Sequence, residues 1–299
     1  MAISQNQSTG IEWTQHTWNP MVGCTIHTPG CTNCYAMRQA ARIEEMGHSP
    51  AYDGTTRIAN GNAVWTGKIS RASDVQMRKP LKIREPSRIF VNSMSDFFHE
   101  GAQDVWRLEA LGIMRATPRH SYQILTKRPE EIGPFIERTG VRFTENIWLG
   151  VTIERGDFAH RVGTLAAIDA AVRFISFEPL IGPLGSISLK GMHWAIIGGE
   201  SGPHSRPMQP DWAREARDLC LAQNVAIFFK QWGIASNNPL FWTAPTGWTG
   251  ARWVAHMDPT GKGGSILDGR PWKEYPPRPA TWDSRPVEDG GRGLTGRLL

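Results

Sequence analysis

The amino-acid sequence predicts an α/β fold, a partial (β/α) barrel of six to seven parallel strands. Short apolar segments rich in β-branched and aromatic residues alternate with helix-forming segments from residue 11 to residue 230. This alternation is typical of a parallel sheet whose faces are covered by helices. Seven candidate strands are too many for a small open sheet and fewer than the eight strands of a complete barrel. A doubly wound sheet is the alternative architecture.

The predicted strands and helices follow one another in chain order. The first strand lies within residues 11–23 and leads directly into a loop at residues 24–34. A helix is expected next, over residues 33–46, because Ala, Met, Arg and Glu are frequent there and Gly47 follows. Further strands are expected at residues 88–94, 122–126, 146–153, 172–177, 194–198 and 225–230. Further helices are expected at residues 104–115, 128–138, 158–170 and 210–223.

Two regions depart from this alternation. Residues 48–87 mix Pro, Gly, Asn and basic residues, and we interpret them as an insertion that holds a short helix at residues 73–78. We assign residues 1–234 to the barrel and residues 235–299 to a C-terminal extension rich in Gly, Pro, Trp and Arg. Within the extension we expect a hairpin from Trp242 to Trp253 as a lid over the barrel mouth, a turn at Asp268-Gly269, and a flexible tail over roughly the last fifteen residues.

Composition and charge are those of an ordinary globular protein, with 40% hydrophobic and 20% charged residues in 299. No apolar run reaches the roughly 18 residues of a membrane-spanning helix, and the first ten residues are polar, so we expect a cytoplasmic protein without membrane contact. The net charge of +5 favours a polyanionic partner such as nucleic acid. The thirteen tryptophans suit either stacking on bases or packing beneath loops.

Three of the four cysteines, Cys24, Cys31 and Cys34, lie within eleven residues of one another in a loop that contains Gly and Pro. So few cysteines in so long a chain do not make a disulfide framework, and a metal site or redox centre is expected instead. Three thiolates on a four-iron cubane, with one iron left open, explain both their number and their position. His27 offers an alternative, a Cys3His zinc site. Cys220 lies between two leucines in a predicted helix and is expected to be a core residue.

Polar residues follow the end of nearly every predicted strand. Because chemistry in α/β folds collects at the carboxyl ends of parallel strands, we expect a site at this edge. An ion pair across the barrel mouth is the alternative role for Glu178, with Lys127, Arg128 or Lys230 as its partner. The strand-end residues are Asn92, Ser93, Ser95 and Asp96, then Thr126, Lys127 and Arg128, then Thr152 and Glu154, and then Glu178, Gly198, Gly199, Glu200, Ser201, Lys230, Gln231 and Trp232.

The motifs of the chain resemble those of a known family. Three cysteines after the first strand of a partial (β/α) barrel are similar to those of the radical S-adenosylmethionine superfamily. The opening IEWTxxTWNPxxGCTxxxxGCxxCYA, followed by FVNSMSDFF, TKRP, SFEPL and GGESG, resembles more narrowly a phage-associated family of uncharacterised three-cysteine-motif proteins, the DUF5131-like proteins. The resemblance covers roughly residues 11–233. For a phage-encoded protein the expected location is the host cytoplasm.

The resemblance implies a cofactor and a reaction. Cys24, Cys31 and Cys34 would bind a [4Fe-4S] cluster, S-adenosylmethionine would chelate its unligated iron, and reduction by an external electron donor would yield a 5′-deoxyadenosyl radical. A nucleic acid or nucleotide is the expected substrate, for modification or repair. Glu178 and Lys230 are the candidate catalytic residues. The candidate cofactor-binding residues are Tyr35, Asn92, Ser93, Ser95, Asp96, Thr126, Lys127, Glu178, Gly198, Gly199 and Glu200.

The chain departs from the superfamily pattern in two ways. The usual spacing is CxxxCxxC, so the gap from Cys24 to Cys31 is three residues longer than usual. The cofactor-binding Gly-Gly-Glu of the superfamily lies on the second strand, whereas Gly198-Gly199-Glu200 ends about the sixth. Two alternatives stay open: a zinc-stabilised nucleic-acid-binding protein without catalysis, and a radical enzyme that acts on a small metabolite or a peptide.

Overall fold

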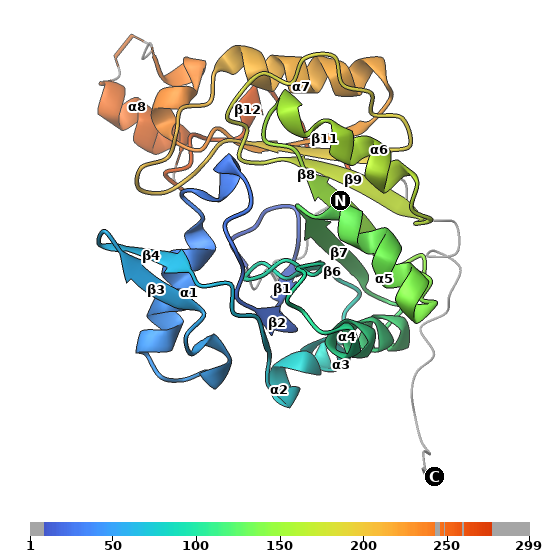
Figure 1. The fold of residues 1–299 in the computed structure, drawn as a ribbon. Coiled ribbons are helices and arrows are strands. Elements are labelled where there is room, and N and C mark those ends of the chain that lie inside the picture. Colours follow the sequence, from blue (N-terminus) through green and yellow to red (C-terminus); the bar gives the residue numbers. More distant parts are fainter. Residues whose placement is uncertain (1–8, 243–245, 248, 259, 277–299) are drawn as a thin grey trace, which may run out of the picture.

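The core of the fold is a seven-stranded parallel sheet that curves into an open barrel (Figure 1). The computed structural model describes residues 9–242, 246–247, 249–258 and 260–276. The strand order is β1-β6-β7-β8-β9-β10-β11, and every neighbouring pair is parallel. The strands are β1 (His16–Trp18), β6 (Arg88–Val91), β7 (Ser121–Thr126), β8 (Ile147–Thr152), β9 (Val172–Phe177), β10 (Trp194–Gly198) and β11 (Ala226–Gln231). The prediction of a partial barrel of six to seven strands is confirmed.

Both faces of the sheet are apolar, as expected for parallel strands covered on each side. The concave face carries one aromatic cluster, with Phe90, Trp148, Phe174, Trp194 and Phe228 at its centre. The alternate residues of the same strands belong to a second, larger cluster that includes residues of four helices. These helices are α4 (Asp104–Ala116), α5 (Ile132–Thr139), α6 (His160–Ala166) and α7 (Pro210–Ala222). As predicted, Cys220 of α7 is fully buried in this second cluster.

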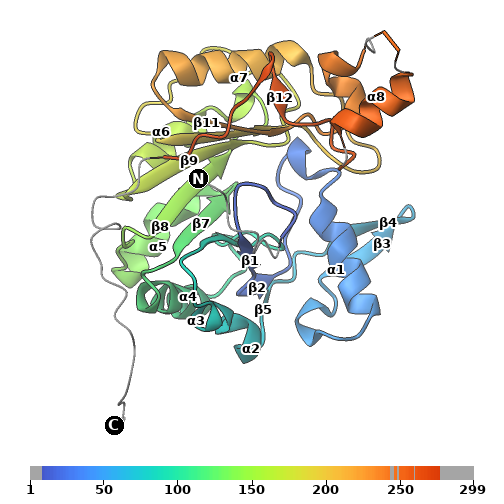
Figure 2. The same ribbon diagram turned by 180° about the vertical axis from the view of Figure 1, so that it is seen from behind.

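The connection from β1 to β6 is a small subdomain with its own core, to one side of the barrel in both views (Figures 1 and 2). Its helix α1 (Tyr35–Glu45) packs against the antiparallel hairpin of β3 (Thr56–Ala59) and β4 (Asn62–Trp65). The predicted first strand divides in two, since β2 (Met21–Val22) leaves the main sheet and pairs with β5 (Ser70–Arg71). The expected short helix is present as α2 (Asp74–Met77), capped by Ser73 and followed by α3 (Lys79–Lys82).

The C-terminal extension differs from its prediction. The hairpin expected from Trp242 to Trp253 is wrong, because residues from Gly250 onward form helix α8 (Gly250–Met257), which Thr249 caps. The turn at Asp268-Gly269 is confirmed and joins β12 (Ile266–Leu267) to β13 (Arg270–Pro271). Both turn residues have positive φ, as a tight hairpin turn requires. The flexible tail expected over roughly the last fifteen residues lies outside the described residues.

The segment after β13 closes the free edge of the sheet rather than covering the barrel mouth. The N–H of Phe229 in β11 donates to the carbonyl of Trp272, and the N–H of Glu274 donates to Ile227. Lys273 then reaches Glu12, ahead of β1, at 2.8 Å. The two edge strands are therefore bridged by flanking residues. In the part of the chain that the structure describes, no helix is long and apolar enough to cross a membrane.

Candidate functional site

The cysteine loop lies over the carboxyl edge of the sheet because hydrogen bonds tie it to several strand ends. The N–H of Gly23 donates to the carbonyl of Met94 after β6, at 3.1 Å. The hydroxyl of Thr28 donates to Glu154 after β8. The amide of Asn33 donates to Glu200 after β10, at 3.0 Å. The predicted juxtaposition of loop and strand ends is therefore present.

The three thiols of the loop lie close enough to influence one another's pKa. Burial, with smaller contributions from the neighbouring Asp96 and from the other two thiols, raises the pKa of Cys24 to about 12, although Arg128 opposes the shift. Burial also raises the pKa of Cys34. All three cysteines are free of disulfides. Among the described residues, no three His, Cys, Asp or Glu side chains are grouped so as to hold a metal ion.

Asp96 and Arg128 form a buried ion pair beneath the first half of the loop. The carboxylate of Asp96 accepts hydrogen bonds from Thr126 Oγ1 at 2.6 Å, from the N–H of Lys127 at 2.9 Å and from Arg128 at 3.2 Å. Arg128 also donates to Thr25 Oγ1 in the cysteine loop, at 2.6 Å. Asp96 and Thr126 were predicted to contact a cofactor. In the structure they bond each other, and Asp96 holds Arg128, which in turn holds the loop.

His99 adds a second contact to the same threonine. Its Nδ1 accepts a hydrogen bond from the N–H of Gly101, so Nε2 carries the proton and donates to Thr25 Oγ1 at 3.1 Å. Burial, with Arg128 next, lowers the pKa of His99 and keeps the ring neutral.

Glu154 is a fully buried carboxylate at the end of β8. Lys127 lies 2.7 Å from its Oε1 and Arg161 lies 3.2 Å from its Oε2, while Thr28 donates to it from the cysteine loop. Burial by itself raises the pKa of Glu154, but Lys127, Thr28 and Arg161 outweigh that effect and the pKa is lowered. The predicted cofactor contact Lys127 therefore spans the edge from β7 to β8 as part of a charged network.

Glu178 and Lys230 form an ion pair across the mouth, as the alternative interpretation of Glu178 predicted. The Nζ of Lys230 lies 2.8 Å from Glu178 Oε1. Ser176 Oγ donates to the other carboxylate oxygen at 3.3 Å. Both charged side chains keep some exposure, 15% for Glu178 and 21% for Lys230. The pair is thus accessible from the open end of the barrel.

The Gly-Gly-Glu segment supports the second half of the cysteine loop. Arg206 donates to the Glu200 carboxylate from its backbone N–H at 2.8 Å and from its guanidinium, and it also donates to the carbonyl of Pro29 at 2.9 Å. Gly199 exchanges hydrogen bonds with Gln231 of β11. Gly198 lies against Glu178, since a Cβ at Gly198 would come within 2.5 Å of Glu178 Oε1.

Asn92 and Ser95 stand out because their polar side-chain atoms are buried and have no hydrogen-bond partner within the described structure. Asn92 is 3% exposed, and both its amide nitrogen and its amide oxygen are unpaired. Its φ of +62° lies in the left-handed region, which Asn adopts more readily than most residues. Unpaired buried polar atoms are rare and costly. Ser93 between them bonds Asn19 instead, and its carbonyl accepts from Tyr35.

The predicted candidates leave out several residues of this site, among them Thr25, Thr28, His99 and Arg206. Two of these lie within the cysteine loop, where only the thiols and His27 attracted attention. Arg206 follows the GGES segment closely in sequence, and His99 follows FVNSMSDFF directly. Proximity to a recognised motif was the one signal that pointed to them.

The family "Protein of unknown function (DUF5131)" matches residues 8–276, and the chain belongs to this family. That match spans the barrel, the cysteine loop and the described part of the C-terminal extension. No curated protein and no solved structure matches the chain.

Proposed function

We propose that this protein is a radical S-adenosylmethionine enzyme whose [4Fe-4S] cluster is held by Cys24, Cys31 and Cys34. One observation carries the proposal. A loop with three free thiols is fixed by hydrogen bonds to the carboxyl ends of β6, β8 and β10 in a partial parallel barrel. This edge is where α/β barrels hold their reaction centres. The resemblance of the sequence motifs to the superfamily supports the same assignment.

The donor atoms at this edge are of the kinds that both parts of the cofactor need, and the three thiols of the loop would have to draw together to hold the cluster. Three thiols with no fourth cysteine in the loop match a cubane that keeps one iron for another ligand, whereas structural zinc calls for four protein ligands. Asn92 offers an unpaired donor and acceptor, and Ser95 offers an unpaired hydroxyl, for the amino and carboxylate groups of S-adenosylmethionine. When bound and reduced, the cofactor pair supplies a 5′-deoxyadenosyl radical for hydrogen abstraction.

The chain itself positions the substrate and excludes water. The aromatic cluster fills the barrel below the site, so it would keep water out of the interior on that side. The Glu178–Lys230 pair places a proton on Lys230 Nζ, where it can be donated to a substrate oxygen or nitrogen. Lys127, held by Glu154, presents a second cation for an anionic group.

The substrate we propose is a nucleic acid or nucleotide, for modification or repair. The net charge of +5 and the cations at the site mouth, Lys127 and Lys230, favour a phosphate-containing ligand. The phage association that the resemblance implies fits a substrate of this class. An external protein or small molecule would deliver the electron.

The test is an anaerobic reaction of reconstituted protein with dithionite and S-adenosylmethionine, scored for 5′-deoxyadenosine. We expect product with the wild type and with Cys220→Ala, and none with Cys31→Ala. Repeating the reaction with single-stranded and duplex nucleic acids then asks which of them accelerates product formation. Colourless protein that holds one zinc ion and yields no 5′-deoxyadenosine would support the zinc-stabilised binding protein instead.

A further inference from the structure

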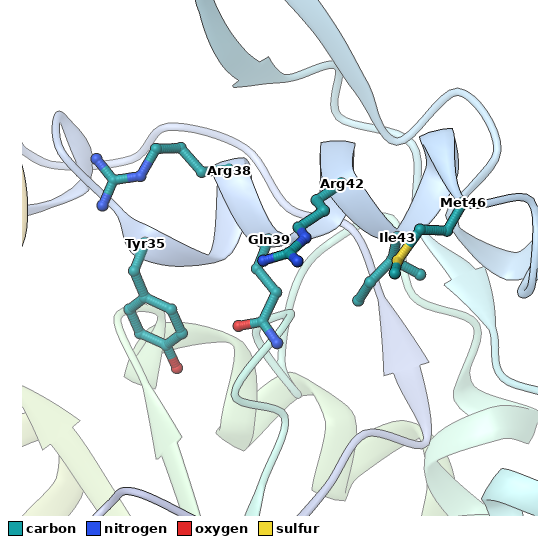
Figure 3. Close-up of a pocket in the computed structure, with 6 residues that line it drawn as sticks. All are labelled: Tyr35, Arg38, Gln39, Arg42, Ile43 and Met46. Carbon is teal, nitrogen blue, oxygen red and sulfur yellow. The ribbon is translucent and has the colours of Figure 1, made fainter.

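A groove runs along α1 away from the cysteine loop, with a volume of about 470 Å³. It is lined by Tyr35, Arg38, Gln39, Arg42, Ile43 and Met46 (Figure 3). Positions four apart in a helix lie above one another, so these six side chains form two adjacent rows on one face. Tyr35 and Gln39 hang from the same side of the helix in Figure 3, one turn apart. The groove is therefore a feature of the helix surface, continuous with the site at its first residue.

Tyr35 connects the groove to the site. It directly follows Cys34, and its hydroxyl donates to the carbonyl of Ser93 at 3.2 Å, at the end of β6. The hydroxyl is thereby satisfied while the residue stays 46% exposed. An anchored and exposed aromatic ring is the platform on which an unpaired base stacks. Tyr35 is thus held for stacking at the entrance of the site.

The groove is also positively charged and carries no acidic side chain among its lining residues. The guanidinium groups of Arg38 and Arg42 make no hydrogen bond or ion pair within the described structure, although most other arginines of the site are paired. They are one helical turn apart, about 6 Å along the axis at 1.5 Å per residue. That spacing is comparable with the separation of successive phosphates in an extended single strand. Free guanidinium groups in such a row match a phosphate backbone.

We propose that this groove binds a single strand of nucleic acid and leads one of its bases into the site. Arg38 and Arg42 contact successive phosphates, and Tyr35 stacks on the base next to the cysteine loop. The proposal rests on the proposed function for its substrate class. Beyond that function, it specifies a single strand as the bound form and the α1 groove as the surface that binds it. A duplex would bury its bases and leave Tyr35 without a stacking partner.

Fluorescence anisotropy with labelled strands of about 12 nucleotides tests the groove, because strands of that length span a single-strand binding site. DNA, RNA and the matching duplex are titrated with wild-type protein at several salt concentrations. We expect the single strands to bind more tightly than the duplex, and the comparison of DNA with RNA identifies the sugar. In Arg38→Gln with Arg42→Gln, we expect the slope of log K against log salt to fall by about 1.4, because each phosphate contact on a single strand contributes about 0.7.

Matched variants separate the groove from general charge. Lys82→Gln with Arg84→Gln removes the same charge from an exposed segment at the end of α3, and we expect the wild-type salt slope to be retained. Tyr35→Leu should weaken single-strand binding about tenfold, as loss of one stacked base does, and Tyr35→Phe, which keeps the ring but loses the bond to Ser93, should weaken it less. Equal loss in both double variants, or tighter binding of duplex than of single strand, would overturn the proposal. Formation of 5′-deoxyadenosine by the wild type is scored separately, so a failed groove and a failed enzyme assignment give different results.

Discussion

The two ends of the barrel interior are built from the same strands but differ in every property that matters for function. At the amino end, the inward positions hold Phe174 on β9 and Trp194 on β10, packed against the other rings of the aromatic cluster. At the carboxyl end, just past the ends of the same strands, Glu178 follows Phe174 by four residues and Glu200 follows Trp194 by six. One period-2 pattern thus changes from aromatic to charged along each strand. The amino end stabilises the fold, and the carboxyl end is where we propose that the chemistry takes place.

Of the substitutions that test this difference between the two ends, we expect the largest effect at Trp194. This ring is fully buried and packs against Trp13, Trp148, Phe228 and Tyr275. We expect Trp194→Ala to lower the free energy of unfolding by about 3–5 kcal/mol, because it leaves a large apolar cavity. Chemical denaturation measures the effect. Unchanged stability would mean that the aromatic cluster does not hold the barrel together.

At Glu154 the carboxyl end also supports the fold, because this carboxylate is fully buried between two cations. In Glu154→Gln, Lys127 and Arg161 lose their shared carboxylate in a buried setting, and we expect a loss of about 3 kcal/mol in the free energy of unfolding. Glu178→Gln at the more exposed pair is the matched control and should cost less than about 1 kcal/mol. Equal losses of unfolding free energy for the two variants would show that the Glu154 pairs stabilise the fold no more than the Glu178–Lys230 pair does.

Acid should affect the amino end through His120. Burial, with a smaller contribution from Arg119, lowers the pKa of this histidine to about 4 from an ordinary value of 6.5. Its Nδ1 accepts from the N–H of Ser87 at 3.2 Å, which requires an unprotonated nitrogen. Stability is thus complete above pH 6.5 and falls as the pH drops from there towards 4, by about 3 kcal/mol.

Urea unfolding over this pH range checks the effect. The pH dependence should be smaller in His120→Asn, which cannot take up the proton. A wild-type slope that this variant leaves unchanged would rule out His120 as the source of the acid sensitivity.

Two glycines on the inward face allow the aromatic cluster and the charged end to be compared with the same small substitution. A Cβ on Gly150 would collide with the buried Phe174 ring, so we expect Gly150→Ala to cost about 1–3 kcal/mol of stability. A Cβ on Gly198 would meet only the end of the Glu178 side chain, which can turn aside. Gly198→Ala should therefore keep its stability within about 0.5 kcal/mol and lose 5′-deoxyadenosine formation. Full activity in Gly198→Ala would remove Glu178 from the proposed chemistry.

Most of the barrel could be predicted from the sequence because each strand has a local pattern, a short apolar segment that ends in polar residues. The sequence also predicted that Cys24, Cys31 and Cys34 share one loop at the carboxyl edge. What it did not predict depends on distant partners. Asn33 and Glu200 are 167 positions apart, and nothing in either segment alone indicates their hydrogen bond.

The C-terminal extension shows the same limit on prediction. Gly, Pro and Trp near residue 250 favoured a hairpin, but Thr249 caps a helix there instead. Local composition did not reveal that the segment around Lys273 pairs with β11 and bonds Glu12. Propensity identified the elements with strong internal patterns and failed where tertiary contacts decide the conformation.

The central claim is that three thiols at the open end of the barrel hold an iron–sulfur cluster, and the iron and sulfide content of anaerobically reconstituted protein tests it most directly. We expect about four irons per chain, with a brown colour, in the wild type and in Cys220→Ala. In Cys24→Ala, Cys31→Ala and Cys34→Ala we expect the cluster to be lost while the fold is retained, since the barrel core lies elsewhere. Full iron in those three variants, or one zinc ion and no iron in the wild type, would contradict the claim.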